Sequence, residues 1–295
     1  MIKIITDTSS DITLSQAKQM NVEILALAVT FGDTPYYQLE DESFEKFYEM
    51  HEKSEVLPVT AQVNPNQYAE LFEKAKKNNE HVIVITISSV LSGTMQSALI
   101  AKEMVDYDRI HIIDSRIATC GQRLLVELAV QLRDAGASAD EIVKKVTEAT
   151  SRVHLVAVMD TLKYLVKGGR LSKSAGMIGS VLNMKPLVCV KDGAVVAVGK
   201  ARGSNKAIKL MLDYIDNKGN IDPSFPFCFG YTKAKGQLDS FIPLAKEKFN
   251  LNNIKTYPIG GVIGTHAGPY AFAAVWIALG EPSLPSLTEL KAVAG

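Results

Sequence analysis

Two arginines in the second half of the chain flank a mostly apolar stretch, and the first of them follows a pair of glycines. Gly168 and Gly169 free the backbone to bend, while Arg170 and Arg202 carry forked guanidinium groups that donate several hydrogen bonds to an anion. Residues 171–201, between the two arginines, are mainly apolar. This pattern predicts a site for an anion that is attached to an apolar body.

Hydroxyl and carboxylate side chains follow the first β-branched run of the chain. Residues 6–11 read Thr-Asp-Thr-Ser-Ser-Asp and include Thr8 and Ser9 as candidates for lining a site. Open α/β sheets bind ligands at the carboxyl ends of their strands, and this segment stands at such an end. Capping of the following helix by Asp7 or Ser10 is the alternative explanation, because both residue types are preferred N-caps.

A second polar segment follows the third β-branched run and leads into a helix. Residues 87–97 place the Ser92 and Thr94 hydroxyls and the amide of Gly93 where a helix begins, a position that favours an anion. Gly93 lets a ligand approach the backbone closely. The segment therefore predicts a cradle for a carboxylate or a phosphate, with an ordinary strand-to-helix turn as the alternative.

Three further segments bring polar side chains towards the same edge. Thr60 precedes a helix, and Asp114 and Ser115 end the fourth β-branched run, where capping also explains them. Thr265 and His266 lie in a turn with several glycines ahead of an apolar run, which we expect to aim both side chains inward.

A serine hydrolase is an alternative class, because Ser92, Asp114 and His266 occur in the chain order of the α/β-hydrolase triad. That triad requires a glycine two residues on either side of the nucleophile, whereas Val90 and Thr94 flank Ser92. The phosphate-binding motifs of P-loop and dinucleotide-binding proteins are absent from the sequence, and no metal-ligand spacing is apparent. We therefore expect neither a nucleotide cofactor nor a metal.

The charge balance excludes several classes of partner. The 295 residues contain 32 Lys and Arg and 32 Asp and Glu, so no overall field attracts nucleic acid or an anionic membrane. The amino-terminal apolar run ends at Asp7, too soon for a secretory signal, and the three cysteines lack zinc-ligand spacing. The longest apolar run, residues 267–280, is too short to span a membrane, and we interpret it as a buried helix. These features predict a cytoplasmic protein without stable membrane insertion.

The first half alternates short β-branched runs with helix-like segments, which predicts a Rossmann-like parallel sheet with helices on both faces. We assign this domain to residues 1–152. Ser138 with Glu141 predicts a capping box at the start of its last helix. The expected strands are residues 2–6, 22–30, 82–87 and 110–113, and the expected helices are residues 15–20, 66–77, 94–105, 122–132 and 138–152.

The second half, residues 153–280, contains runs that can pair locally. Asp192 and Gly193 lie between two β-branched runs, a strong hairpin signal, so we predict a mixed α/β domain. Residues 281–295 form a tail to which we assign no role. The expected strands are residues 154–159, 187–190, 194–198, 227–231 and 255–259.

Six segments together resemble the DegV family, in the same order and spacing. They are Thr-Asp-Thr-Ser-Ser-Asp from residue 6, Thr-Ala-Gln from 60, Ser-Ser-Val-Leu-Ser-Gly-Thr from 88, Ile-Asp-Ser from 113, Leu-Val-Lys-Gly-Gly-Arg-Leu from 165, and Ile-Gly-Thr-His-Ala-Gly-Pro from 263. The resemblance covers nearly residues 1–280. One departure is Ala61, where the family commonly has a serine, so a hydroxyl is missing there.

The resemblance implies a two-domain α/β protein that buries a long-chain fatty acid of 14 to 18 carbons between its domains. It implies that Thr60, Ser92, Gly93 and His266 hold the carboxylate. Family members serve as the fatty-acid-binding subunit of bacterial fatty acid kinase. They present the carboxylate to a separate catalytic subunit that makes an acyl phosphate for phospholipid synthesis.

By the same resemblance, Arg170 and Arg202 would guide kinase docking or phosphoryl transfer. The chain itself would then perform no chemistry and need no cofactor, with transient membrane contact compatible with lipid exchange. A protein-interaction module that uses the two arginines without any ligand remains a further alternative.

Overall fold

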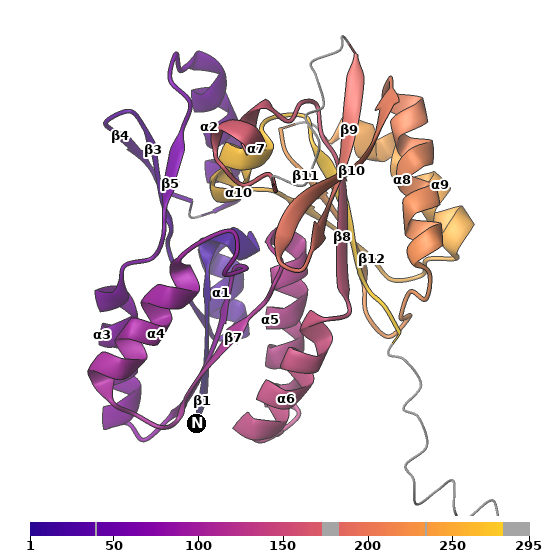
Figure 1. Cartoon of the computed structure of the whole chain (residues 1–295). Coiled ribbons are helices and arrows are strands. Elements are labelled where there is room, and N and C mark those ends of the chain that lie inside the picture. Colours follow the sequence, from indigo (N-terminus) through magenta and orange to yellow (C-terminus); the bar gives the residue numbers. More distant parts are fainter. Residues whose placement is uncertain (39, 173–182, 234, 280–295) are drawn as a thin grey trace, which may run out of the picture.

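The structure of the protein is a computed structural model that describes residues 1–38, 40–172, 183–233 and 235–279 (Figure 1). The predicted tail, residues 281–295, lies outside these ranges. Within them the chain forms two larger sheets and one small sheet. No described helix has both the length and the apolar character needed to cross a membrane.

The first sheet is parallel throughout, as the alternation of strands and helices predicts. Its strand order is β2-β1-β6-β7, and the two central strands, β1 and β6, are largely buried. The strands are β1 (Ile2–Asp7), β2 (Val22–Leu25), β6 (His81–Thr86) and β7 (Ile110–Asp114).

Helices cover both faces of the first sheet, with α3 and α4 on one face and α5 and α6 on the other (Figure 1). The capping box predicted from Ser138 and Glu141 is present at the start of α6, and Asn64 with Gln67 forms another at α3. The helices of this half are α1 (Leu14–Met20), α3 (Pro65–Lys77), α4 (Thr94–Val105), α5 (Thr119–Asp134) and α6 (Ala139–Thr150), with a short 3-10 turn η1 (Thr8–Ser10).

The prediction of one continuous strand over residues 22–30 is wrong. The run divides into β2 and β3 (Ala28–Phe31), which belong to different sheets. β3 pairs antiparallel with β4 (Thr34–Tyr36) and β5 (Val59–Ala61), and α2 (Asp41–Lys53) lies between these two in the chain. Because β-branched residues favour strands on either side of a bend, their pattern did not reveal the break at residues 26–27.

The second sheet is mixed, with the order β10-β9-β8-β13-β11-β12 and parallel pairing only between β11 and β12. The predicted hairpin joins β9 to β10, where Asp192 (φ 51°) and Gly193 (φ 80°) both adopt the left-handed conformation of a type I′ turn. The strands are β8 (Val153–Val158), β9 (Met184–Lys191), β10 (Ala194–Arg202), β11 (Phe227–Tyr231), β12 (Ile254–Pro258) and β13 (Phe272–Ile277).

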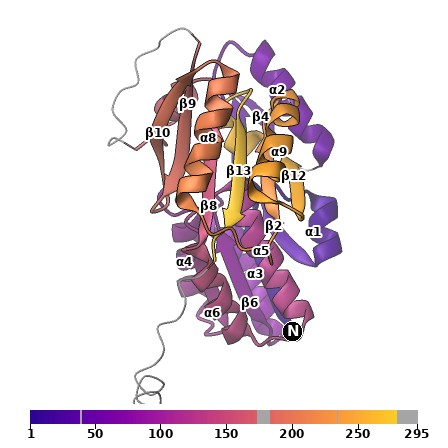
Figure 2. The same ribbon diagram turned by 90° about the vertical axis from the view of Figure 1, so that its right-hand side faces the viewer.

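Two long helices, α8 (Ser204–Lys218) and α9 (Gly236–Phe249), cover the outer face of this sheet (Figure 2). An aromatic cluster fills the space beneath them, including Phe229, Phe241 and Trp276. Two short helices, α7 (Lys163–Lys167) and α10 (Gly261–Ala267), lie on the opposite side and contact one another.

The prediction of a buried helix over residues 267–280 is also wrong. Residues 272–277 form β13, a central strand whose six residues are all buried between β8 and β11. A short apolar run that is buried on both faces lacks the alternation that marks a half-exposed strand, so its pattern resembles that of a buried helix.

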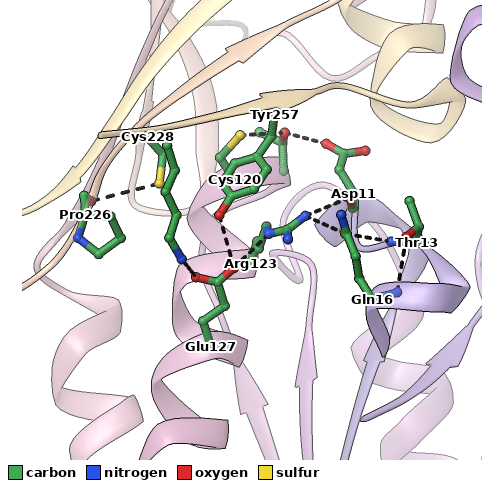
Figure 3. Close-up of polar contacts among 11 residues, drawn as sticks. Asp11, Thr13, Gln16, Cys120, Arg123, Glu127, Pro226, Cys228 and Tyr257 are labelled. Atoms are coloured by element: carbon green, nitrogen blue, oxygen red, sulfur yellow. Dashed lines mark hydrogen bonds and ion pairs between the residues drawn. The ribbon is translucent and has the colours of Figure 1, made fainter. Parts of the chain in front are cut away.

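Helix α5 packs against both of the larger sheets. It contacts β1 and β6 of the first sheet and β8, β11 and β13 of the second, within one continuous apolar core. Figure 3 shows polar contacts that add to this packing: the Arg123 guanidinium bonds Glu127 at 2.9 Å and lies 3.8 Å from the centre of the Tyr257 ring. Lys255 of β12 bonds Glu127 at 2.7 Å. The division at residue 152 thus separates two sheets that share a core, and stays a prediction.

Candidate functional site

A cavity of about 340 Å³ lies between the second sheet and the loops that follow strands of the first sheet, beside the start of α5. We call it the central cavity. Its volume is within the range of small-molecule sites, roughly 300–1,000 Å³. Apolar side chains make up most of its lining and come from both halves of the chain. These residues are Leu27, Ile87, Leu91, Leu155, Met159, Leu165, Val188, Val190, Val195, Ile259, Val262, Ile263 and Phe272, together with the alanines 61, 118, 157, 267, 271 and 273.

Polar groups gather on part of this lining. Thr60 comes from β5, Ser92 and Gly93 from the turn before α4, and His266 from α10. Arg170, just after α7, is the one charged side chain among the described residues that line the cavity. Four segments that are distant in the sequence thus bring hydrogen-bond donors to one apolar cavity.

Thr60 and His266 contact one another directly. The Thr60 Oγ1 and His266 Nε2 atoms are 2.9 Å apart, whereas the buried His266 Nδ1 has no hydrogen-bond partner. An unpaired buried N–H costs more than an unpaired lone pair, so we assign the proton to Nε2, which donates to Thr60. The Thr60 hydroxyl is then left to donate its own proton to an acceptor in the cavity.

The environment of His266 keeps its imidazole neutral. Burial lowers the pKa of His266 to about 4, and the positive charge of Arg170 acts in the same direction. At neutral pH the side chain is therefore an uncharged donor and acceptor. An anion beside the imidazole would raise its pKa and so oppose the effects of burial and of Arg170.

Arg170 links two turns at the cavity. Its Nε donates to the Leu91 carbonyl at 3.1 Å and its Nη1 donates to the Gly168 carbonyl at 2.6 Å. Leu91 immediately precedes Ser92, so the guanidinium fixes the backbone that carries the serine. Its charge, held at the cavity lining, favours an anionic ligand.

Two of the predicted glycines pack closely against side chains of the protein itself. A Cβ at Gly168 would lie 2.2 Å from Nδ1 of His266, so only glycine leaves room for the imidazole. A Cβ at Gly93 would lie 2.0 Å from Oε1 of Gln62, the end of a flexible side chain. Gly169 lies next to Arg170 with φ at 68°, a left-handed conformation that glycine adopts without strain.

The start of α10 is held by buried polar groups. The carboxylate of Asp11 accepts from the Gly260 amide at 2.9 Å and from the Thr119 hydroxyl at 2.5 Å. Burial raises the pKa of Asp11 to about 7, while these two donors and Arg123 oppose that rise. Thr119 lines the central cavity in a left-handed conformation (φ 50°) that is strained for a β-branched residue. Asp11 therefore couples α10 and α5 at the cavity wall.

The candidates proposed only as site lining do not line the central cavity, and their polar side chains are bonded within the protein. Thr8 accepts from the Leu27 amide, and Ser9 bonds Asp7 and Gln122. Asp7 caps the 3-10 turn η1 by accepting from the Ser9 amide, whereas the predicted helix, α1, is capped by Thr13 and by neither Asp7 nor Ser10. The remaining candidates outside the lining are Thr94, Asp114, Ser115, Gly168, Gly169 and Thr265.

Their local contacts explain these placements. The Thr94 hydroxyl is buried against that of Ser92 at 2.9 Å, and Ser115 bonds the Ile117 backbone. Thr265 donates to the Gly261 carbonyl within α10, since the glycine-rich segment is itself a helix and not the turn that we predicted. Neither Asp114 nor Ser115 caps α5, whose N-cap, Ala118, makes no side-chain cap bond.

The geometry argues against a hydrolase triad. The Asp114 carboxylate bonds Ser89 and the Arg116 amide, and His266 Nδ1 faces Gly168 without a carboxylate partner. A triad requires the base to be oriented by the third residue, and that contact is missing here.

Arg202 lies apart from the lining of the central cavity. It ends β10, pairs with Met184 in the sheet register and is exposed. The two arginines that stood out together in the sequence therefore occupy different environments.

Sequence reasoning missed Gln62 and Thr119, which both line the cavity. Gln62 donates to the Ser97 hydroxyl at 2.8 Å and packs against Gly93. The sequence offered one indication of this role: Gln62 lies two residues after Thr60, which was itself a candidate. The apolar lining was not predicted residue by residue, because it combines strands of the second sheet with β5, α10 and loops that follow strands of the first sheet.

Comparison with known proteins adds to this geometry. The model of a family described as uncharacterised proteins, the DegV family, matches residues 1–279. This chain belongs to the DegV family. The finding confirms the resemblance in the sequence. A DegV domain-containing protein of Caldanaerobacter subterraneus is 36% identical over 270 residues, which cover 92% of this chain and 96% of that protein.

Solved DegV structures share the two-domain α/β fold. DegV from Bacillus subtilis, a fatty acid binding protein, matches with a TM-score of 0.80 and 28% identity over 94% of this chain and 99% of its own. A stearic acid-binding protein from Eubacterium ventriosum matches with a TM-score of 0.82 and 26% identity over 94% and 98%. A DegV family protein from Thermus thermophilus, also described by its fatty acid binding, matches with a TM-score of 0.83 and 25% identity over 94% and 99%.

Proposed function

We propose that this DegV protein binds a long-chain fatty acid of 14 to 18 carbons in the central cavity. The observation that carries the proposal is an apolar cavity whose lining includes Thr60, Ser92, Gly93 and His266, with Thr60 and His266 in direct contact. Structural relatives that bind fatty acids, one of them stearic acid, support the same ligand class.

The chemistry of the lining suits a fatty acid. Each buried methylene contributes about 0.8 kcal/mol, so fourteen methylenes supply roughly 11 kcal/mol before the costs of binding. The carboxylate accepts from the Thr60 and Ser92 hydroxyls and from the Gly93 amide, and it lies beside His266. Each such charge-assisted hydrogen bond contributes about 1.5–3 kcal/mol. The tail thus provides affinity and the polar groups fix the orientation.

We further propose that the protein is a carrier and performs no chemistry. It presents the carboxylate to a separate kinase subunit in the cytoplasm, which converts it to an acyl phosphate for phospholipid synthesis. Arg202, exposed on β10, contributes to docking of that subunit, and Arg170, at the cavity, supports the developing charge during phosphoryl transfer. The missing triad contact favours this role over hydrolysis.

Ligand binding is tested by native mass spectrometry of the purified protein, followed by organic extraction of the bound species. We expect a mass increase that matches an acid of 14 to 18 carbons. A protein that neither copurifies with such an acid nor takes one up from a mixture would refute the proposal.

The carrier role requires a separate experiment. The loaded protein is incubated with a bacterial fatty acid kinase catalytic subunit and ATP, and acyl phosphate is trapped with hydroxylamine. We expect product only when both proteins are present. Binding of the catalytic subunit with equal affinity to the delipidated and loaded forms, without product, would favour a ligand-independent interaction module instead.

A further inference from the structure

A second cavity adjoins the central cavity, and the two share one lining residue. This outer cleft, of about 410 Å³, is lined by Arg116, Ile117, Thr150, Ser151, Val153, His154, Val190, Lys191, Asp192, Gly193, Tyr214 and Lys218. Comparison of the described lining residues shows that Val190 alone belongs to both cavities. One valine side chain therefore lies between an apolar interior and a polar surface cleft.

Val190 is part of a partition between the two cavities, and neighbouring residues on β8 and before α5 form the rest of it. Leu155 and Val153 are two residues apart on β8 and share a face, yet Leu155 lines the central cavity and Val153 lines the outer cleft. Ile117 lines the outer cleft, whereas the next residue, Ala118, lines the central cavity. Ile117 and Val153 both pack against Gly121, where an added Cβ would lie within 3.2 Å of each. Close packing against Gly121 therefore restricts the positions of Ile117 and Val153.

This partition is remote from Thr60 and His266. Leu155 on β8 and Met159, the residue that follows β8, mark two ends of the lining, about 13 Å apart at 3.3 Å per residue. His266 belongs to the Met159 end, because α7 follows Met159 and contacts α10, which carries His266, and Thr60 bonds His266. Val190 belongs to the Leu155 end, since Cys189 pairs with Val156 in the sheet register.

The two sides of the partition differ in their chemistry. Arg116, Lys191 and Lys218 give the outer cleft three cationic side chains against one acid, Asp192, which pairs with Arg116 at 3.3 Å. A methyl-terminated chain that entered this cleft would meet charged groups and water, so it would gain little there. An acyl chain is therefore confined to the central cavity.

We propose that Val190 is a specificity-determining residue, whose side chain closes the far end of the central cavity and sets the longest acyl chain that the protein accepts. This inference rests on the proposed fatty-acid binding. Replacing valine by alanine removes two methyl groups from the partition, which corresponds to roughly two carbons of additional chain length. A buried methylene changes affinity about fourfold, so two change it roughly fifteenfold.

The test compares Val190→Ala with Val196→Ala in the full chain. Val196 follows Val195, the cross-strand partner of Val190, so it faces the other side of the sheet, and it lines neither cavity. Each purified protein is incubated with an equimolar mixture of saturated acids of 14 to 22 carbons, and the bound species are quantified by native mass spectrometry. The measured quantity is the occupancy of each acid relative to the one that wild type prefers.

For Val190→Ala we expect the acid two carbons beyond the wild-type limit to gain roughly tenfold or more in relative occupancy. Val196→Ala should stay within threefold of wild type. Val190→Leu provides the opposite perturbation and should lower the longest accepted chain, which keeps the test decisive if the alanine variant folds poorly.

An unchanged length profile in loaded Val190→Ala and Val190→Leu, or an equal change in Val196→Ala, would overturn the role of Val190 and leave fatty-acid binding intact. A wild-type protein that takes up no acid would instead refute the proposed function, and this inference with it.

Discussion

The ionisation of His266 offers a quantitative test of the polar site. Its imidazole is largely buried, its Nδ1 is unpartnered, and burial together with Arg170 lowers its pKa to about 4. We expect the ligand-free protein to keep His266 neutral between pH 5.5 and 8. A fatty acid carboxylate bound to Thr60 would lie about 4 Å from the imidazole and add a negative charge.

The magnitude of the ligand effect follows from Coulomb's law. Two unit charges 4 Å apart interact by about 1 kcal/mol in water and about 4 kcal/mol at an effective dielectric constant of 20. At 1.4 kcal/mol per pKa unit, the bound carboxylate should raise the pKa of His266 by roughly 1 to 3 units. The loaded protein should therefore titrate this residue between about pH 5 and 7.

The assay is a titration of the imidazole signals by ¹H–¹⁵N NMR in ligand-free and loaded protein, with His266→Asn to assign the resonance. A ligand-free midpoint near 6.5 would refute the described burial. An identical midpoint in both states would refute carboxylate binding beside this residue.

The same pKa predicts how stability depends on pH. The unfolded chain protonates His266 near its ordinary pKa of 6.5, whereas the folded protein does so only near 4. This contribution is fully present above pH 6.5 and is lost as the pH falls towards 4, by roughly 3 kcal/mol. Urea unfolding of ligand-free wild type and His266→Asn should show a shallower decline for the variant over this range; parallel curves would contradict the prediction.

Three other substitutions, the first with a matched control, separate the roles of the site. Thr60→Val should weaken fatty-acid binding roughly tenfold or more by removing a charge-assisted hydrogen bond, whereas Thr265→Val, whose hydroxyl bonds only within α10, should leave affinity within threefold in competition binding. Gly168→Ala should displace His266 and lower affinity at least as much, and a crystal structure with an unmoved imidazole would disprove this reasoning. Arg202→Ala should retain bound acid but lose kinase coupling at least tenfold; loss of the acid with full coupling would reverse the assignment.

The sequence predicts most of the framework because its signals there are local. Alternating strands and helices indicate the parallel sheet, and the capping box of Ser138 and the turn at Asp192 each depend on residues within a few positions. The prediction of a helix where β13 lies was wrong for the opposite reason. Its residues are buried by partners from distant segments, so their apolar character carries no period.

The residues of the candidate site were likewise predicted only in part. Residue type and position before a helix were enough to select Ser92 and Gly93, which line the cavity. Thr8 and Ser9 have the same residue types after a strand, but their side chains satisfy the backbone and Asp7. Only the three-dimensional contacts distinguish an internally bonded hydroxyl from one that faces a cavity. For Arg170 and Arg202, likewise, proximity in the sequence pattern did not predict their different environments.

A crystal structure of the protein loaded with palmitic or stearic acid tests the central proposal most directly. We predict continuous density for the acyl chain in the central cavity, with its carboxylate within 3.2 Å of the Thr60 and Ser92 hydroxyls and its methyl end beside Val190. Density for the acid outside this cavity, or with the carboxylate at the Val190 end, would contradict the proposal.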